Sequence, residues 1–172
     1  MKSAVAALSA LLDVVARVVI GLAGLALVAL VAITGWMVFG RYVLNDTPTW
    51  VERAALLAML FVALPVAAVG VRERFHMAVE FVLAALPRGP RTVVRVVCDL
   101  LMLGFGIIMA VWGNSLAEAM WSFKIPLIGL SQGLQYVPLV ICGTLTAVFS
   151  AEHLLRRAAG LDPLGQHAHS LD

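Results

Sequence analysis

The sequence predicts an all-α membrane protein with four transmembrane helices, and length, composition and charge placement all support this fold class. The chain is 62% hydrophobic and 13% charged, whereas soluble globular domains are about 25% charged. Four stretches of 18 to 27 uncharged residues lie between Arg17 and Arg41, Arg53 and Arg72, Asp99 and Glu118, and Lys124 and Glu152. A helix of 18 to 23 residues is roughly 27–35 Å long, close to the thickness of a bilayer core. We therefore expect one membrane domain over residues 1–159, without a separate soluble module.

The basic residues are distributed unequally between the two sides of the predicted membrane. With a cytoplasmic N-terminus, nine of the 12 Lys and Arg residues lie inside, and only Arg41, Arg53 and Lys124 lie outside. Such a bias in short loops predicts that both termini are cytoplasmic. Aromatic side chains gather near the predicted outer interface, where amphipathic rings settle at headgroup level. They are Trp36, Phe39, Tyr42, Trp50, Trp112, Trp121, Phe123 and Tyr136.

The first two helices are expected over residues 11–43 and 50–72. Asp13 and Arg17 interrupt the apolar N-terminal run, and the segment after Arg17 is too long for the core of a signal peptide, so we expect a retained helix. Residues 45–48 read Asn-Asp-Thr-Pro, which is typical of a turn. Thr49 and Glu52 then fit a capping box, in which each side chain accepts a hydrogen bond from the other residue's backbone.

A short apolar segment, residues 75–86, follows the second helix and is too short to cross a bilayer. His76 and Glu80 share one face at i,i+4 spacing, and the other faces are apolar. This pattern predicts a short helix lying in the cytoplasmic interface. The alternative is an extension of the second or third helix that packs against the bundle.

The last two helices are expected over residues 90–121 and 131–157. Pro90 suits a first helical turn, and residues 125–131 look irregular. We expect residues 160–172 to be a disordered cytoplasmic tail. Small residues at every fourth position let helices approach closely in lipid. Such rows occur at Ala54 and Ala58, Ala63 and Ala67, Gly106 and Ala110, and Gly143, Ala147 and Ala151. They favour a bundle but do not indicate which helices touch.

Ionisable residues near the bilayer midplane would indicate an ion or proton pathway, but here the acidic residues lie close to helix ends. Neighbours on the same helix offer partners: Arg95 precedes Asp99 by one turn, and Arg156 follows Glu152 by one turn. Asn114 lies one turn before Glu118. We therefore expect a chain that does not conduct or pump an ion alone.

Cofactor sites are also not predicted. His76 and His153 lie near helix ends, at depths unsuited to burying a haem between them. His76 with Glu80 supplies only two potential metal ligands. Cys98 and Cys142 differ in predicted depth by about 15 Å or more, whereas bridged Cα atoms lie within about 7 Å. We expect both to be small apolar fillers, with no cofactor in this chain.

Several short motifs occur in a characteristic order over roughly residues 35 to 140. They are Arg41 to Asn45, Trp50 to Glu52, Arg72 to His76, Ile125-Pro126, Gly129 to Ser131 and Tyr136 to Pro138. Together with the four-helix topology, they resemble the small membrane subunit (the Q-type, small permease protein) of tripartite ATP-independent periplasmic (TRAP) transporters. The family often has two acids after the Trp, but here the second is Arg53. A role that needs a pair of acids is therefore not carried over, whereas a cap from Glu52 is.

The motifs and the aromatic belt mark ten candidate interface or topology residues. These are Arg41, Trp50, Glu52, Arg72, Arg74, His76, Trp121, Pro126, Tyr136 and Pro138. The resemblance assigns no catalytic role to any of them, and we expect no enzymatic activity and no nucleic-acid binding.

The resemblance implies a function in secondary transport at the bacterial inner membrane. In such systems a periplasmic binding protein delivers an organic acid to a membrane complex. The large membrane subunit would carry the substrate and sodium sites and move in an elevator-like way. This chain, surrounded by membrane lipids, would pack against the fixed scaffold of that subunit and enlarge it as part of a stator.

Two alternatives from other classes stay open on the sequence. One is a redox membrane anchor that associates with haem or quinone. The other is the small subunit of a tripartite tricarboxylate transporter, which also has four helices. A large permease encoded beside this chain would favour the TRAP interpretation.

Overall fold

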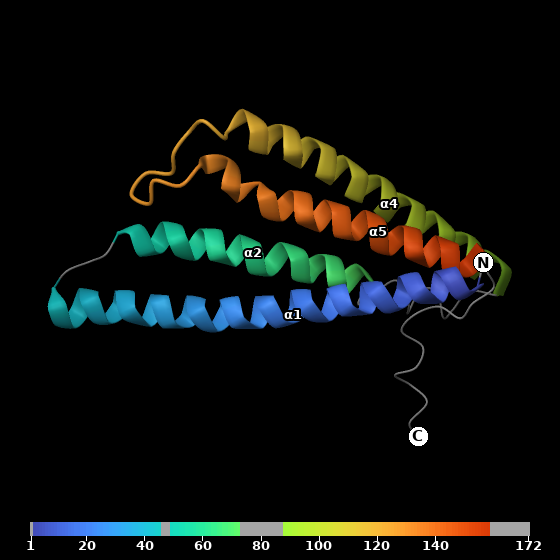
Figure 1. Cartoon of the computed structure of the whole chain (residues 1–172), viewed down its shortest axis with the longest axis horizontal. Helices are drawn as coiled ribbons and strands as arrows, with labels where there is room; N and C mark the ends of the chain where they lie inside the picture. Colours follow the sequence, from blue (N-terminus) through green and yellow to red (C-terminus); the bar gives the residue numbers. More distant parts are fainter. Residues whose placement is uncertain (1, 46–48, 73–87, 159–172) are drawn as a thin grey trace, which may run out of the picture.

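The computed structural model describes residues 2–45, 49–72 and 88–158, and these ranges form a bundle of long helices (Figure 1). The helices are α1 (Lys2–Phe39), α2 (Trp50–Arg72), α4 (Arg88–Ala119) and α5 (Val137–Ala158). A π-helical turn, η1 (Gly40–Leu44), extends α1, and a 3-10 turn, η2 (Gln132–Gln135), precedes α5. All four long helices have the length and apolar composition needed to cross a membrane, as expected.

The helix ends differ from the expected ones mainly at the N-terminus. Helix α1 begins at Lys2 rather than near residue 11, so the expected start was wrong. Its first turns are rich in Ala and Leu, which favour helix, and Ser9 and Leu12 are buried against the bundle. The predicted interfacial helix over residues 75–86 and the predicted disordered tail over residues 160–172 lie outside the described residues.

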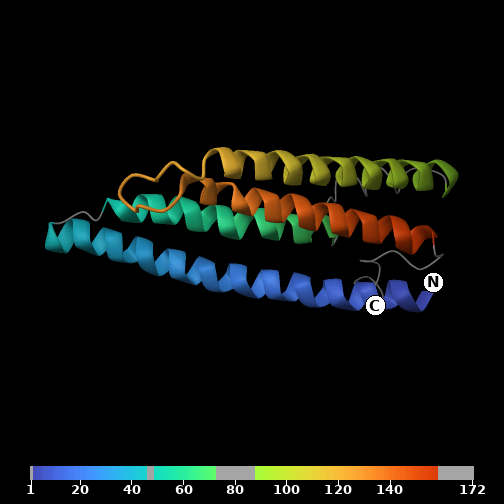
Figure 2. The same ribbon diagram turned by 45° about the horizontal axis from the view of Figure 1, so that its top comes forward.

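The helices pair as two antiparallel hairpins, α1 with α2 and α4 with α5 (Figures 1 and 2). Helix α5 lies in the middle, because it packs against both α4 and α2, whereas α1 packs mainly against α2. The start of α1, the end of α2, the start of α4 and the end of α5 all lie at one end of the bundle. We call this the ion-paired end, because ion pairs of Arg72 and Arg157 join the helices there. The opposite end, which carries residues 120–136, is the loop end.

Two glycines let α4 and α5 approach closely near the middle of the bundle. A Cβ atom on Gly106 would lie 2.7 Å from the backbone nitrogen of Ala147, and one on Gly143 would lie 2.6 Å from that of Ala110. Real Cβ atoms do not approach backbone so closely, so neither position accepts a side chain without a shift. Two of the small-residue rows expected from the sequence therefore face each other across this one interface.

The connection between α4 and α5 is a folded hairpin held by its own backbone. Lys124 and Ser131 form an antiparallel bridge. Next to it, the Ile125 N–H donates to the Leu130 carbonyl at 2.7 Å, and the Gln132 N–H donates to the Phe123 carbonyl at the same distance. The Ile125 side chain is buried. The segment expected to be irregular is thus non-helical but ordered by hydrogen bonds.

The most buried apolar cluster lies toward the ion-paired end. It consists of Leu12 and Ala16 of α1, Val69 of α2 and Phe149 of α5. Farther along α1, large side chains such as Leu25 and Val28 are about two-thirds exposed. The core therefore holds three helices together at one end and leaves long apolar faces uncovered elsewhere.

Candidate functional site: an ion-paired end and uncovered faces

Arg72, the last residue of α2, is the centre of a buried polar network. Its side chain is 6% exposed and reaches acids on two other helices. The guanidinium Nε lies 3.0 Å from Glu152 Oε2 of α5, and Nη1 lies 2.7 Å from Asp13 Oδ1 of α1. The Arg72 guanidinium also lies over the ring of Phe149, 5.4 Å from its centroid. One side chain thus ties α2 to both α1 and α5.

Glu152 is the most completely buried charge of this network, with a side-chain exposure of 0%. Arg72 Nη2 donates to its second oxygen, Oε1, at 3.4 Å, so that the guanidinium faces the carboxylate with two nitrogens. Arg156 Nη1 lies 4.0 Å from the same Oε1 and donates to Ser9 Oγ at 2.8 Å. A buried carboxylate is tolerated when paired and hydrogen-bonded in this way.

Backbone groups complete the network. Arg72 Nη2 donates to the Ser9 carbonyl at 3.3 Å, and His153 Nε2 lies 3.0 Å from the Arg72 carbonyl oxygen. The last turn of a helix leaves carbonyls without intrahelical partners, so His153 of α5 satisfies one of those of α2. This arrangement joins helices and neutralises charge. It also places His153, one of the histidines considered as a haem ligand, at hydrogen-bond distance from the backbone of α2.

A second interhelical ion pair lies at the same end, where Arg157 Nη2 of α5 is 3.2 Å from Asp99 Oδ2 of α4. For Asp99 and Glu152, the sequence suggested only a partner one turn away on the same helix. The structure adds an interhelical partner for each, Arg157 for Asp99 and Arg72 for Glu152. The signal that could have found the interhelical partners is topological, because the charge counts already assigned Asp13, Arg72 and Glu152 to the same side of the membrane.

The loop end carries most of the residues singled out from the sequence. Trp50, Trp121, Pro126 and Arg41 are exposed. Trp121 also closes the hairpin, because its carbonyl accepts a 2.7 Å hydrogen bond from Ser131 Oγ. The aromatic belt thus surrounds this end without forming a site of converging side chains.

Tyr136 and Pro138 lie where η2 meets α5. Tyr136 is half-buried and caps η2, its N–H donating to the Gly133 carbonyl. Pro138 is fully buried in the first turn of α5, a position where a missing N–H costs nothing. Arg74 and His76 lie outside the described residues. Of the eight other candidates, seven lie at the loop end, whereas Arg72 lies at the ion-paired end.

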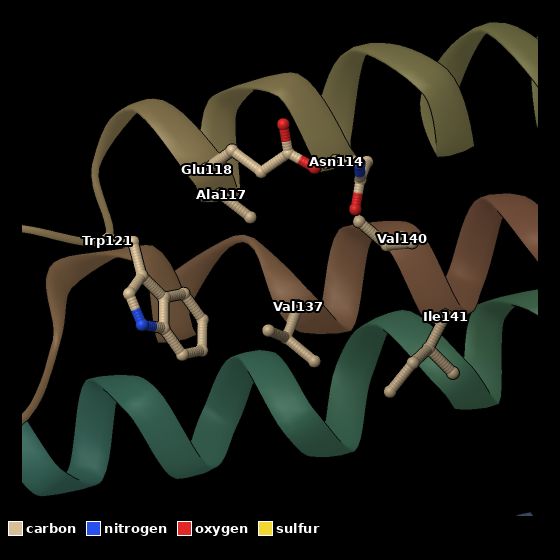
Figure 3. A pocket seen from close by; sticks show the side chains of 7 residues that line it. All are labelled: Asn114, Ala117, Glu118, Trp121, Val137, Val140 and Ile141. Carbon is tan, nitrogen blue, oxygen red and sulfur yellow. Dashed lines mark hydrogen bonds between the residues drawn. The ribbon is translucent and has the colours of Figure 1, made fainter.

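Two apolar grooves open at the loop end. One lies between α1 and α2 and is lined by Leu30, Thr34, Met37, Val51, Glu52, Ala55, Leu56 and Met59. The other, the α4–α5 groove, is lined by Asn114, Ala117, Glu118, Trp121, Val137, Val140 and Ile141 (Figure 3). Asn114 Nδ2 donates to Glu118 Oε1 at 2.7 Å, as their spacing of one turn suggested. Each groove therefore has an apolar lining and one carboxylate.

The outward faces of α1 and α4 are long, apolar and uncovered. Exposed large side chains run along α1 from Leu11 to Phe39 and along α4 from Val93 to Leu116. Such contiguous apolar surface marks contact with lipid or with another protein. Within the described residues, no group of three or more His, Cys, Asp or Glu could hold a metal ion, and both cysteines are free.

Comparison with known families points to the same class of protein as the motifs. The family model described as "Tripartite ATP-independent periplasmic transporters, DctQ component" matches residues 30–160. No individual curated protein matches the chain. The matched region contains α2, α4, the loop between α4 and α5, all of α5 and the part of α1 nearest the loop end.

Proposed function

Because this chain belongs to the DctQ family, the small permease component of TRAP transporters, we propose that it packs on the scaffold of the large membrane subunit as part of the stator. The family is one of transporter components and not of enzymes, and its members work with a large membrane subunit and a periplasmic binding protein. The chain is accordingly a multi-pass membrane protein.

The observation that carries the proposal is the contrast between the two kinds of surface on the bundle. The charges of the ion-paired end neutralise one another across α1, α2, α4 and α5, whereas the faces of α1 and α4 remain apolar and uncovered. In a bilayer, helices associate through close packing of small and apolar side chains. A rigid bundle with uncovered faces therefore suits a fixed supporting subunit.

We place the moving parts of the transport cycle on other chains. Sodium coupling and recognition of an organic acid would reside in the large subunit, and the periplasmic binding protein would deliver the substrate. At the ion-paired end, the charged side chains pair across helices rather than lining a pathway, which supports this division of labour. We also place the chain in the inner membrane, because there the loop end would face the periplasmic binding protein and the ion-paired end would face the cytoplasm.

The proposal is tested by reconstitution of the chain with and without its large subunit. The two chains, co-expressed, should purify as a one-to-one complex, and proteoliposomes holding the complex and the binding protein should take up an organic acid under a sodium gradient. The isolated chain should move none. Sodium-driven uptake by the isolated chain would refute the stator role, as would recovery of this chain only as a homo-oligomer.

A further inference from the structure

The α4–α5 groove carries an acidic group that pairs with no basic side chain in the described part of the chain. Glu118 is exposed and lies one residue before the end of α4. In the described part of the chain, none of the ion pairs includes Glu118. Within these residues, its carboxylate accepts a side-chain hydrogen bond from Asn114 alone. That hydrogen bond uses Oε1 and orients the carboxylate, so Oε2 is left to accept from a ligand.

The groove next to this carboxylate is apolar. Its walls are Ala117 of α4, Val137, Val140 and Ile141 of α5, and the ring of Trp121 (Figure 3). Its volume is about 520 Å³, which is within the range of about 300–1,000 Å³ typical of small-ligand sites.

The adjoining interface between the two helices is closed. A Cβ on Gly113 would lie 3.2 Å from Val140 Cγ2 and 3.4 Å from Leu139 Cδ2, so side chains of α5 already fill the space against α4 there. A slender apolar chain that lies along the surface of the helix pair would fit the groove without opening this interface. The acyl chain of a phospholipid has this shape.

We propose that the α4–α5 groove binds a phospholipid with a primary ammonium headgroup, its ammonium paired with Glu118 and one acyl chain against Val137, Val140 and Ile141. An ammonium donates hydrogen bonds to a carboxylate, and charge-assisted bonds of this kind are the stronger ones. A quaternary choline has no N–H to donate, and an anionic headgroup is repelled. This site requires no partner subunit and thus goes beyond the proposed function.

Lipid retention by the purified full-length chain tests the proposal. The chain in mild detergent is mixed with equal amounts of phosphatidylethanolamine and phosphatidylcholine with identical acyl chains, and retained lipids are counted by native mass spectrometry. The wild-type chain should retain more phosphatidylethanolamine. Glu118→Gln keeps an acceptor for Asn114 and removes the charge, and should lower the ratio of the two lipids about fivefold, the upper value for an exposed ion pair.

Two further variants locate the effect. Ile141→Trp fills the groove from an exposed position and should reduce retention of both lipids, which keeps the test valid if Glu118→Gln does not fold. Leu25→Trp adds a ring on the exposed face of α1, away from both grooves, and should leave the ratio at its wild-type value. Circular dichroism establishes that each variant is folded.

Three outcomes would overturn the proposal. The first is an unchanged lipid ratio in Glu118→Gln together with unchanged retention in Ile141→Trp. The second is a preference of the wild-type chain for phosphatidylglycerol when this lipid, with the same acyl chains, is added to the mixture in equal amount. The third is loss of co-purification with the large subunit in Glu118→Gln while lipid retention stays the same, which would assign the carboxylate to a cationic side chain of the partner. Failure of the stator proposal alone would leave the lipid ratio unaffected.

Discussion

Replacing Arg72 with methionine should destabilise the bundle strongly, because it leaves a buried carboxylate without its main partner. In Arg72→Met, Glu152 stays fully buried, and the nearest remaining cation, Arg156, has its Nη1 4.0 Å from Oε1. Removing one member of a buried pair typically costs about 3–5 kcal/mol. Loss of the contact with Asp13 adds little, since the Asp13 side chain is 48% exposed and exposed pairs contribute about 0–1 kcal/mol.

The double variant Arg72→Met/Glu152→Met measures how much of this cost comes from the interaction between the two charges. It removes both buried charges and fills their space with apolar side chains, a replacement that is often neutral or stabilising. We therefore expect it to be more stable than Arg72→Met alone by at least about 2 kcal/mol. Its cost should also fall below the sum of the costs of the two single variants, as it does for residues in contact.

The assay is equilibrium unfolding in mixed detergent micelles, followed by circular dichroism, for the wild-type chain, the two single variants and the double variant. Asp13→Asn provides the matched control, because it changes the exposed partner of the same arginine and should cost less than about 1 kcal/mol. A cost below about 1 kcal/mol for Arg72→Met, or a double variant whose cost equals the sum of the singles, would show that the pair does not hold the bundle together.

Three further predictions concern helix packing, the second ion pair and topology. Gly143→Ala should destabilise the bundle by about 1–3 kcal/mol through overpacking, since its Cβ would meet backbone of α4. Gly104→Ala, with nothing within 4 Å, should be neutral or slightly stabilising in the same unfolding assay, and equal effects would refute the close crossing. Asp99→Asn should cost about 1–2 kcal/mol in that assay. This is less than for Arg72→Met, because the Asp99 and Arg157 side chains are 16% and 18% exposed, whereas Glu152 is fully buried. A cost equal to that of Arg72→Met would contradict this reasoning. In a cysteine-free background in intact cells, a cysteine at Gly129 should react with an impermeant reagent and one at Gly89 should not, and labelling at Gly89 would reverse the orientation inferred from the basic residues.

The presence of four membrane-length helices could be read from the sequence because it depends on local properties. Bilayer thickness sets how many consecutive apolar residues are needed, and those residues are contiguous in the chain. The break after η1 is similarly local: Asn45 adopts a left-handed conformation, with φ 55°, and its N–H donates to the Gly40 carbonyl, which asparagine tolerates better than most residues. The family resemblance rested on motifs of this local kind.

Only the tertiary structure decided which residues meet across helices. Neighbours four residues apart on one helix can be paired from spacing alone, as for Asn114 with Glu118. The partners of Arg72 and Asp99, and the facing of Gly106 toward Gly143, depend on the rotation and relative depth of separate helices. From the sequence, several small-residue rows could have formed the close helix contact, and several acids could have paired with Arg72. The packing of α5 between α2 and α4 determines which of them do so. The ion-paired end is therefore a product of assembly, because its charges come from segments up to 147 residues apart in the chain.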